Sequence, residues 1–365
     1  MVIRCSPIAF CMTYWLILSP VQLAASQTIT VRWADALNQP PAWYGTDEAR
    51  RIANRVLEHQ REHGGWPKNT DMTLPPDPAV LDAARKRPDS TIDNGATVTE
   101  MRFLVRVYGL SREPRYRDAL LKGLDYLLEA QYANGGWPQF FPLRTDYSRY
   151  ITFNDNAMIN VVTLLSEVAS GSSDWTWVDP PHRVRSRAAV EKAVEVILRA
   201  QVRVDGRLTA WCAQHDEVTL EPRKARAYEH PSLSGQETVG IVRFLMARNK
   251  PDERVVDAIE AAVAWLKSVQ IKGLRLEQRQ DPSLPEGRDV VAVQDPAAAP
   301  LWARFYEIGT NRPIFSGRDG VIRYSLAEIE HERRIGYAWL GSWPARLLDD
   351  QYPSWQRAHN RVAGP

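Results

Sequence analysis

The feature that most constrains the fold is a repeat of about seventy residues. The segment LEHQREHGGWPKN at 57–69 recurs as LEAQYANGGWPQF at 128–140. Looser copies follow as LRAQVRVDGRLTAW at 198–211 and LKSVQIKGLRLE at 266–277. Each copy carries a glutamine at the same phase, namely Gln60, Gln131, Gln201 and Gln270. Regular copies of one motif predict similar supersecondary units placed one after another.

Helical periodicity surrounds every copy. Apolar residues recur at spacings of three and four over 116–127, directly before the second copy, and a second set of such stretches covers 98–108, 158–165 and 239–246. The paired glycines of the first two copies favour a chain reversal, because glycine adopts left-handed backbone angles without strain. Two helices in each of roughly three repeats predict a mainly α fold, a single-domain (α/α)3 helical toroid or incomplete α/α barrel.

The first 26 residues are typical of a secretory signal peptide. Arg4 precedes a largely apolar run, and Ala24-Ala25-Ser26 offers small residues for cleavage. We therefore expect 1–26 to be a leader and 27–365 to form one domain that is secreted or periplasmic, without a membrane segment once the leader is removed. An uncleaved anchor is the alternative. Cys212 would then be the remaining cysteine, so we expect no internal disulfide.

Two pairs of an acid and an amide precede predicted helices. TIDNGATV carries Asp93 and Asn94, and ITFNDNAM carries Asp155 between two asparagines. Helix capping is the simplest interpretation of either pair, because Asp and Asn are favoured N-caps. If the helices start at one rim, however, both carboxylates meet at one opening. Carboxylate and amide oxygens suit calcium better than zinc, and an acidic ligand could complete such a site.

Basic residues supply the complement. Lys224 and Arg226 lie in PRKARAYEHPSLSGQE, and Arg304 and Arg318 lie in WARFYEIGTNRPIFSGRDG. The glycines around Arg318 predict a tight turn that presents its side chain outwards, where pairing with Asp319 is the plain alternative to a functional role. Arginine grips carboxylates through two parallel hydrogen bonds, and together with the many aromatic residues and the two aspartates these residues suit a polyanionic sugar as the ligand. The net charge of +2 gives no indication of a nucleic-acid partner.

Several long motifs together resemble one known family. GGWPKN, TIDNGAT, FNDNAM, ARAYE-x-PSLSG and PLWARFYEI-x-TNRPIF-x-GRDG occur in the order found in the pectate lyases of polysaccharide lyase family 10, from about Arg51 to Trp343. The resemblance implies three helix pairs in a toroid, which agrees with the repeat. It also implies endo-cleavage of polygalacturonate by β-elimination, with Ca²⁺ bridging protein and substrate carboxylates.

The same resemblance assigns roles to individual residues. It places Asp93 and Asp155 in the calcium site, with Asn94 beside them as a substrate-binding residue. It makes Arg318 the base that removes the proton from C5 of the uronate.

Three further basic residues are expected to bind the substrate. The resemblance assigns Arg226 and Arg304 to substrate binding, and Lys224 joins them by proximity alone. Free guanidinium titrates above about 12, so an arginine base needs alkaline conditions and a crowded cationic site.

Two other functions fit the same residues. A glycoside hydrolase acting on uronate-containing chains would use Asp93 and Asp155 as acid and base. A binding protein for acidic oligosaccharides would need no catalytic residue. For the enzyme itself we expect a monomer with an acidic polysaccharide as its partner.

Overall fold

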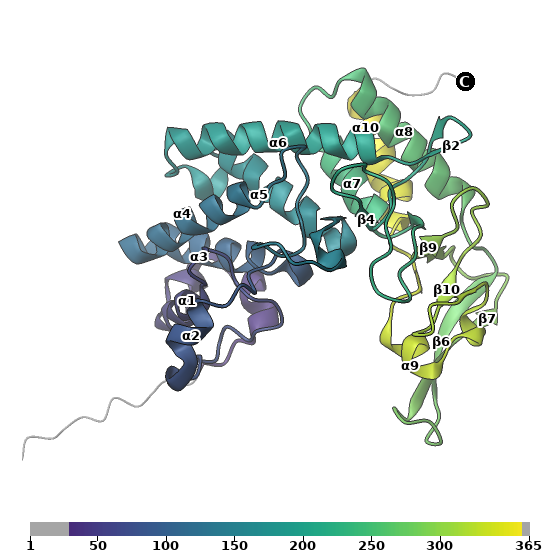
Figure 1. Cartoon of the computed structure of the whole chain (residues 1–365), viewed down its shortest axis with the longest axis horizontal. Coiled ribbons are helices and arrows are strands. Elements are labelled where there is room, and N and C mark those ends of the chain that lie inside the picture. The colour runs from purple at the N-terminus through teal and green to yellow at the C-terminus, as the bar shows by residue number, and fades with distance from the viewer. Residues whose placement is uncertain (1–28, 360–365) are drawn as a thin grey trace, which may run out of the picture.

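The structure is a computed structural model that describes residues 29–359 (Figure 1). The predicted leader, 1–26, lies outside the described residues. None of the described helices is long and apolar enough to span a bilayer.

The longer helices form two rows. One row contains α3 (Val98–Ser111), α5 (Ala157–Ser170) and α7 (Glu237–Met246), and the other contains α1 (Asp47–His59), α4 (Pro114–Glu129), α6 (Pro180–Ala200) and α8 (Glu253–Ser268). We call these the inner and outer rows. The helices pack as the pairs α3–α4, α5–α6 and α7–α8, and each pair contacts the next (Figure 1). The prediction of a mainly α, incomplete toroid of helix pairs is confirmed.

Shorter elements fill the loops. Short helices are α2 (Leu81–Arg85), α9 (His331–Gly336) and α10 (Tyr352–Ala358), the last preceded by a π-helical turn, Leu347–Gln351. Short 3-10 segments lie at Trp33–Asn38, Pro41–Gly45, Pro78–Val80, Asp93–Gly95, Tyr147–Arg149, Asn154–Asn156, Ser173–Trp175 and Leu326–Glu328.

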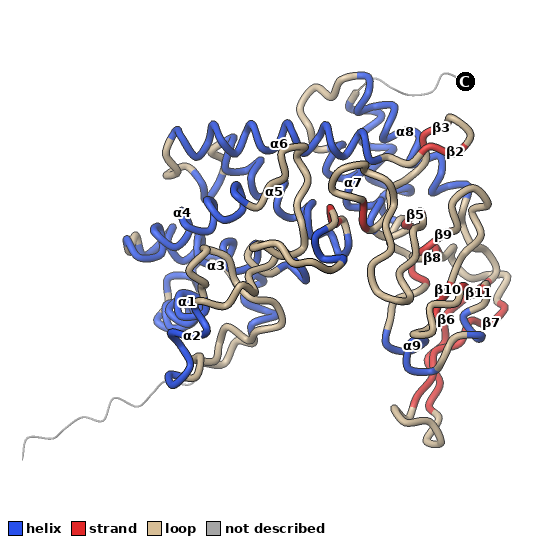
Figure 2. The backbone as a smooth tube through the Cα atoms, viewed as in Figure 1, coloured by secondary structure: helices blue, strands red, loops and turns tan. Residues whose placement is uncertain are grey.

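Strands are short and pair only in twos within the described residues. The longest pair is the antiparallel hairpin of β6 (Leu274–Gln280) and β7 (Arg288–Gln294), which extends away from the helices (Figure 2). Two-residue strands are β1 (Ile151–Thr152), β2 (Arg203–Val204), β3 (Arg207–Leu208), β4 (Gln214–His215), β5 (Leu233–Ser234), β8 (Trp302–Ala303), β9 (Phe305–Tyr306), β10 (Phe315–Ser316), β11 (Ile322–Arg323) and β12 (Leu340–Gly341). The pairs β1–β4, β5–β9 and β8–β12 join loops that are distant in sequence.

The repeated glutamine joins neighbouring outer helices. The side-chain amides of Gln60, Gln131 and Gln201 donate to a main-chain carbonyl of α4, α6 and α8 at 2.9, 2.9 and 3.0 Å, respectively. Each also donates to a carbonyl of its own following loop. Because one acceptor lies on the next outer helix and the other on the loop that follows the glutamine, each side chain joins a helix end to its neighbour, and the repeat stabilises the outer row.

A buried tryptophan repeats in the same way. The indole N–H of each donates at 2.7–2.8 Å to a carbonyl in the last turn of the preceding outer helix. The four tryptophans are Trp66, Trp137, Trp211 and Trp302. Carbonyls at helix C-termini lack intrahelical partners, so each indole both fills the core and closes a helix end.

The expected chain reversals occur at Gly64 and Gly135. Their φ angles are +100° and +104°, and a Cβ on either would lie 2.2 Å from a main-chain carbonyl oxygen, of Lys122 and Lys192 respectively. No side chain fits so close an approach, so glycine is required at both positions. These loops lead the chain from the outer row to the rim where the inner helices begin.

Candidate active site

Two 3-10 turns lie side by side at this rim, directly before α3 and α5. The second residue of each turn is left-handed, with φ of 52° at Asn94 and 50° at Asp155. Asn and Asp adopt this conformation more readily than other non-glycine residues. Asp93 and Asn154 are the first residues of their turns, and Asn94 and Asp155 are the second, so the acid lies one position later in the second turn.

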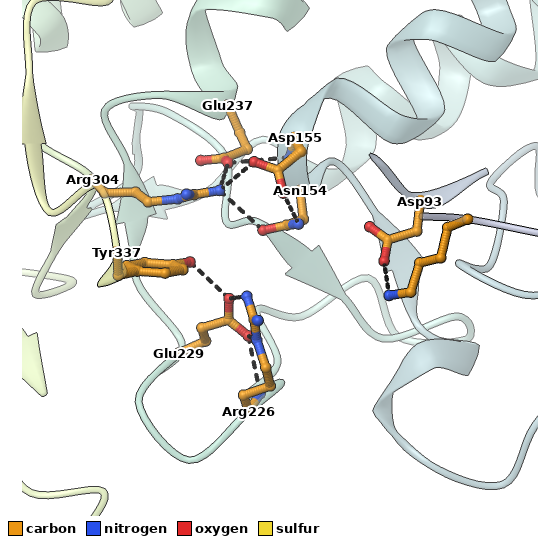
Figure 3. A network of polar contacts seen from close by, with 9 residues as sticks. Asp93, Asn154, Asp155, Arg226, Glu229, Glu237, Arg304 and Tyr337 are labelled. Atoms are coloured by element: carbon orange, nitrogen blue, oxygen red, sulfur yellow. Dashed lines mark hydrogen bonds and ion pairs between the residues drawn. The ribbon is translucent and has the colours of Figure 1, made fainter. Parts of the chain in front are cut away.

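The capping interpretation is wrong for both aspartates. The N-cap residues of α3 and α5 are Thr97 and Asn156, and neither side chain accepts a hydrogen bond from its helix. The Asp93 and Asp155 carboxylates instead form ion pairs with basic side chains (Figure 3). Their sequence position therefore serves a polar site rather than the helix ends.

A cavity of about 290 Å³ lies between these turns and the loops from the C-terminal half. Five predicted site residues line it together, namely Asp93, Asn94, Asp155, Arg226 and Arg304. The remaining lining residues are Lys68, Gln139, Tyr147, Asn154, Gln214, Glu229, Gly336, Tyr337 and Ala338. The inner-row turns thus contribute acids and amides, and the later loops contribute arginines.

Arg304 forms the centre of a buried network. It is 4% exposed, and its Nη2 donates to Asp155 Oδ1 at 2.8 Å and to Glu237 Oε1 at 2.7 Å. Nη2 also lies 3.2 Å from the Asn154 side-chain oxygen. Burial lowers the pKa of Arg304, but Glu237, Tyr337 and Asp155 outweigh burial and hold that pKa above its ordinary value. Arg304 therefore stays cationic beside Asp155.

Lys68 is the cationic partner of Asp93. Its ammonium lies 2.5 Å from Asp93 Oδ2, and its Nζ lies 5.5 Å from the centre of the Phe140 ring. Asp93 is almost fully buried. Each of the two predicted calcium ligands thus already faces a basic side chain, Lys68 at one and Arg304 at the other.

A further ion pair lines the opposite wall. Arg226 Nε donates to Glu229 Oε2 at 2.7 Å, and the Tyr337 hydroxyl donates to Glu229 Oε1 at 2.7 Å. Burial raises the pKa of Glu229, but Arg226 and Tyr337 outweigh burial and hold it below its ordinary value. The Arg226 guanidinium also lies 4.9 Å from the centre of the Tyr228 ring. Arg226 is therefore held in place before any ligand arrives.

Arg318 and Lys224 are not among the residues that line this cavity. The Arg318 side chain is 65% exposed, and it pairs with Glu332 through Nη2 to Oε1 at 2.9 Å. The plain alternative of pairing with Asp319 is wrong, because Asp319 pairs with Arg323.

The Arg318 and Lys224 loops nevertheless lie together. A Cβ on Gly320, two residues after Arg318, would lie 3.5 Å from the Lys224 ammonium. Glu332 also accepts from Arg333, whose guanidinium lies 4.8 Å from the centre of the Tyr228 ring. Since Arg226 stacks on the same ring, Tyr228 connects the Arg318 loop to the cavity wall.

Sequence reasoning missed several lining residues. Lys68 and Gln139 occupy equivalent places after the repeated Trp-Pro, so the repeat itself could have identified both. Glu229, which lines the cavity, and Glu237, which accepts from Arg304, lie inside the stretch already singled out for its basic residues. No sequence motif pointed to Tyr337, because it reaches the cavity only through the pairing of distant loops.

The donor set suits a hard cation only in part. Within residues 29–359, no group of three or more His, Cys, Asp or Glu side chains is placed to hold a metal. Asp93, Asp155 and the Asn94 amide still offer the oxygen ligands that calcium prefers. These residues fit calcium when a ligand supplies further oxygen atoms and when Lys68 and Arg304 move away from the two carboxylates.

Comparisons with known proteins agree on one group. A family model described as pectic acid lyase matches residues 60–348. A solved structure of an aspartate-to-alanine variant of the family 10 polysaccharide lyase from Cellvibrio cellulosa, in complex with trigalacturonic acid, is 37% identical with a TM-score of 0.75. That alignment covers 88% of this chain and 96% of the other. A second structure of the family 10 polysaccharide lyase from Cellvibrio cellulosa is 35% identical, with coverages of 90% and 97% and a TM-score of 0.73. No curated protein sequence matches.

Proposed function

The chain belongs to the pectic acid lyase family, polysaccharide lyase family 10, and on that premise we propose that it is a pectate lyase. It cleaves the α-1,4 bonds of polygalacturonate by calcium-assisted β-elimination and releases 4,5-unsaturated oligogalacturonates. The observation that carries the proposal is the convergence of Asp93, Asp155, Arg226 and Arg304 on one cavity. The complex of the Cellvibrio cellulosa variant with trigalacturonic acid supports a uronate polymer as the substrate.

The cavity suits the charge that elimination creates. Removing the proton on C5 leaves negative charge that spreads onto the neighbouring uronate carboxylate. Arg226 and Arg304 are held by Glu229 and Glu237, so their guanidinium groups need little rearrangement when that charge develops. Asp93 and Asp155 would hold calcium, which when bound would supply further positive charge and make C5–H more acidic.

Arg318 serves as the base. Its neutral guanidine takes the C5 proton, the C4–C5 double bond forms, and the bond from C4 to the glycosidic oxygen breaks. The leaving oxygen then takes a proton from solvent. Glu332 raises the pKa of Arg318 by hydrogen bonding and by its charge, so the base acts only after it has left Glu332. Lys224, beside the same loop, binds a substrate carboxylate and adds positive charge.

A hydrolase fits the site less well. Inverting and retaining glycosidases both need one protonated carboxylic acid beside the scissile bond. Asp93 and Asp155 each form an ion pair with a basic side chain, so neither is placed as that acid.

The pectate lyase acts as a monomer on acidic polysaccharide, in the periplasm or outside the cell, after removal of the leader.

Mass spectrometry of the products tests the proposal. Each unsaturated oligogalacturonate is one water molecule lighter than the product of hydrolysis at the same bond. We expect the lighter series from polygalacturonate. The heavier series would make the protein a hydrolase, and an unchanged polymer that still binds the protein would make it a binding protein.

A further inference from the structure

A second cavity adjoins the first. It has a volume of about 730 Å³ and shares two lining residues, Lys68 and Asn94, with the cavity described above. Its other walls are the first turn of α3, the loop 67–71 and the N-terminal segment 32–38. Asn94 donates to the Asn69 side-chain oxygen at 2.9 Å, which ties two of these walls together. The volume is ample for a ligand of more than one ring.

Trp33 provides an apolar wall. The ring is half-buried and packs edge-on against Phe103, with 5.4 Å between centroids and 72° between planes. This contact holds the indole in place. Trp33 also lines the cavity. A fixed aromatic ring of this kind gives the apolar face of a sugar a surface to pack against.

Arg32 provides a cation beside the tryptophan. Its side chain is 81% exposed and forms one ion pair, with Asp35 at 2.7 Å. Exposed pairs of this kind contribute little to stability, so a ligand carboxylate can replace Asp35 at small cost. Asp71, at the cavity edge, accepts two hydrogen bonds from Thr73 and so faces its own loop.

Glu100 provides an unsatisfied polar group. It is 3% exposed, and its Oε2 is buried without a hydrogen-bond partner. Burial raises the pKa of Glu100 to about 8, so the carboxyl is largely uncharged at neutral pH and can donate a hydrogen bond. A buried polar atom without a partner in the wall of a cavity is expected to find one in a ligand.

We propose that this second cavity is an additional subsite, which takes the next uronate units of the same polygalacturonate chain beyond the Asp93 site. The inference rests on the proposed function. The sugar ring packs against Trp33, its carboxylate meets Arg32, and a hydroxyl accepts from Glu100. Lys68 and Asn94 lie where the chain passes from one cavity to the other.

The test is the dependence of kcat/KM on substrate length. Oligogalacturonates from the dimer to the octamer are compared for the wild type, Trp33→Ala and Arg32→Ala, with Arg203→Ala on the exposed β2–β3 hairpin as the matched control. The ratio of kcat/KM for the longest oligomer to that for the shortest cleaved one should fall about tenfold in Trp33→Ala and in Arg32→Ala, since tenfold corresponds to about 1.4 kcal/mol. The ratio for Arg203→Ala should equal that of the wild type.

Calorimetric titration with the dimer and the octamer separates this inference from the proposed function. If the wild type cleaves nothing, the lyase proposal fails, yet weaker octamer binding by the two variants would still support the subsite. If the wild type cleaves and neither variant changes the length dependence of kcat/KM or of binding, the subsite is wrong. Arg32→Ala carries the test alone if Trp33→Ala fails to fold, because the exposed Arg32 side chain supports no core contact.

Discussion

The guanidinium of Arg318 donates two hydrogen bonds to the Glu332 carboxylate, from Nη2 to Oε1 at 2.9 Å and from Nε to Oε2 at 3.0 Å. Both contacts favour the charged form of the guanidinium. The residue proposed as the base is therefore held as a cation in the ligand-free protein. Its release from Glu332 becomes part of activation.

Replacing Glu332 with Gln should move the limb of kcat/KM that rises with pH to lower pH. Glu332 raises the pKa of Arg318, so its removal lowers that pKa and leaves more neutral guanidine at any given pH. The profile of kcat/KM reports groups of the free enzyme, in which this pair exists. Asp319→Asn is the control, because Asp319 pairs with Arg323. An unmoved limb, or equal movement in both variants, would contradict this role of Glu332.

Replacing Lys68 with Met should strengthen calcium binding in the absence of substrate, by about tenfold. The ammonium of Lys68 forms an ion pair with the Asp93 carboxylate and repels any second cation that approaches it. Isothermal titration of the protein with calcium measures the effect without reference to activity. Lys272→Met, on an exposed loop, should leave calcium affinity unchanged. Equal or weaker binding by Lys68→Met would show that Lys68 does not compete for Asp93.

Replacing Glu237 with Ala should lower the free energy of unfolding by about 3–5 kcal/mol, because it leaves a buried guanidinium short of one partner. Glu237 is 1% exposed and accepts from Arg304 at 2.7 Å. Urea denaturation gives the value, with Glu58→Ala on the half-buried surface of α1 as the control. A loss below about 1 kcal/mol would show that Asp155 alone compensates Arg304.

Much of the fold follows from the repeat. Gln60, Gln131 and Gln201 recur because each bonds to the next outer helix, and the tryptophans that follow them close helix ends. Periodicity also identified the helices. The hairpin of β6 and β7 does not follow from the repeat, because most of its residues are polar and none is fully buried.

Most residues of the site could be predicted from the sequence, but their ion-pair partners could not. Sequence motifs identified Asp93, Asp155 and Arg304, and the structure brings them to one cavity. The partners Lys68 and Glu332 were not predicted, because ion pairs between separate loops leave no local pattern. Asp155 has a left-handed backbone, which aspartate adopts more readily than most residues. This explains why an aspartate at this position resembled a helix cap in the sequence.

Replacing Gln131 with Ala should cost about 1–3 kcal/mol of unfolding free energy, because it removes two hydrogen bonds that join the end of α4 to α6 and to the following loop. Its amide donates to Ala189 of α6 at 2.9 Å and to Gly135 at 3.0 Å. Gln270→Ala is the matched control, since no hydrogen bond of the Gln270 side chain is found within residues 29–359, and it should change stability by less than about 0.5 kcal/mol. Thermal and urea denaturation measure both variants. Equal effects would show that the repeated glutamine does not stabilise the outer row.

The most direct test of the central claim is the ultraviolet absorbance of unsaturated uronide during incubation with polygalacturonate at alkaline pH. The wild type should give a steady rise that a calcium chelator abolishes. Asp93→Asn and Asp155→Asn should reduce the rate by about 10²–10³-fold while remaining folded, as expected for groups that stabilise developing charge. A flat trace accompanied by new reducing ends, or an undiminished rise in both variants, would contradict the assignment of this cavity as the site of a calcium-assisted elimination.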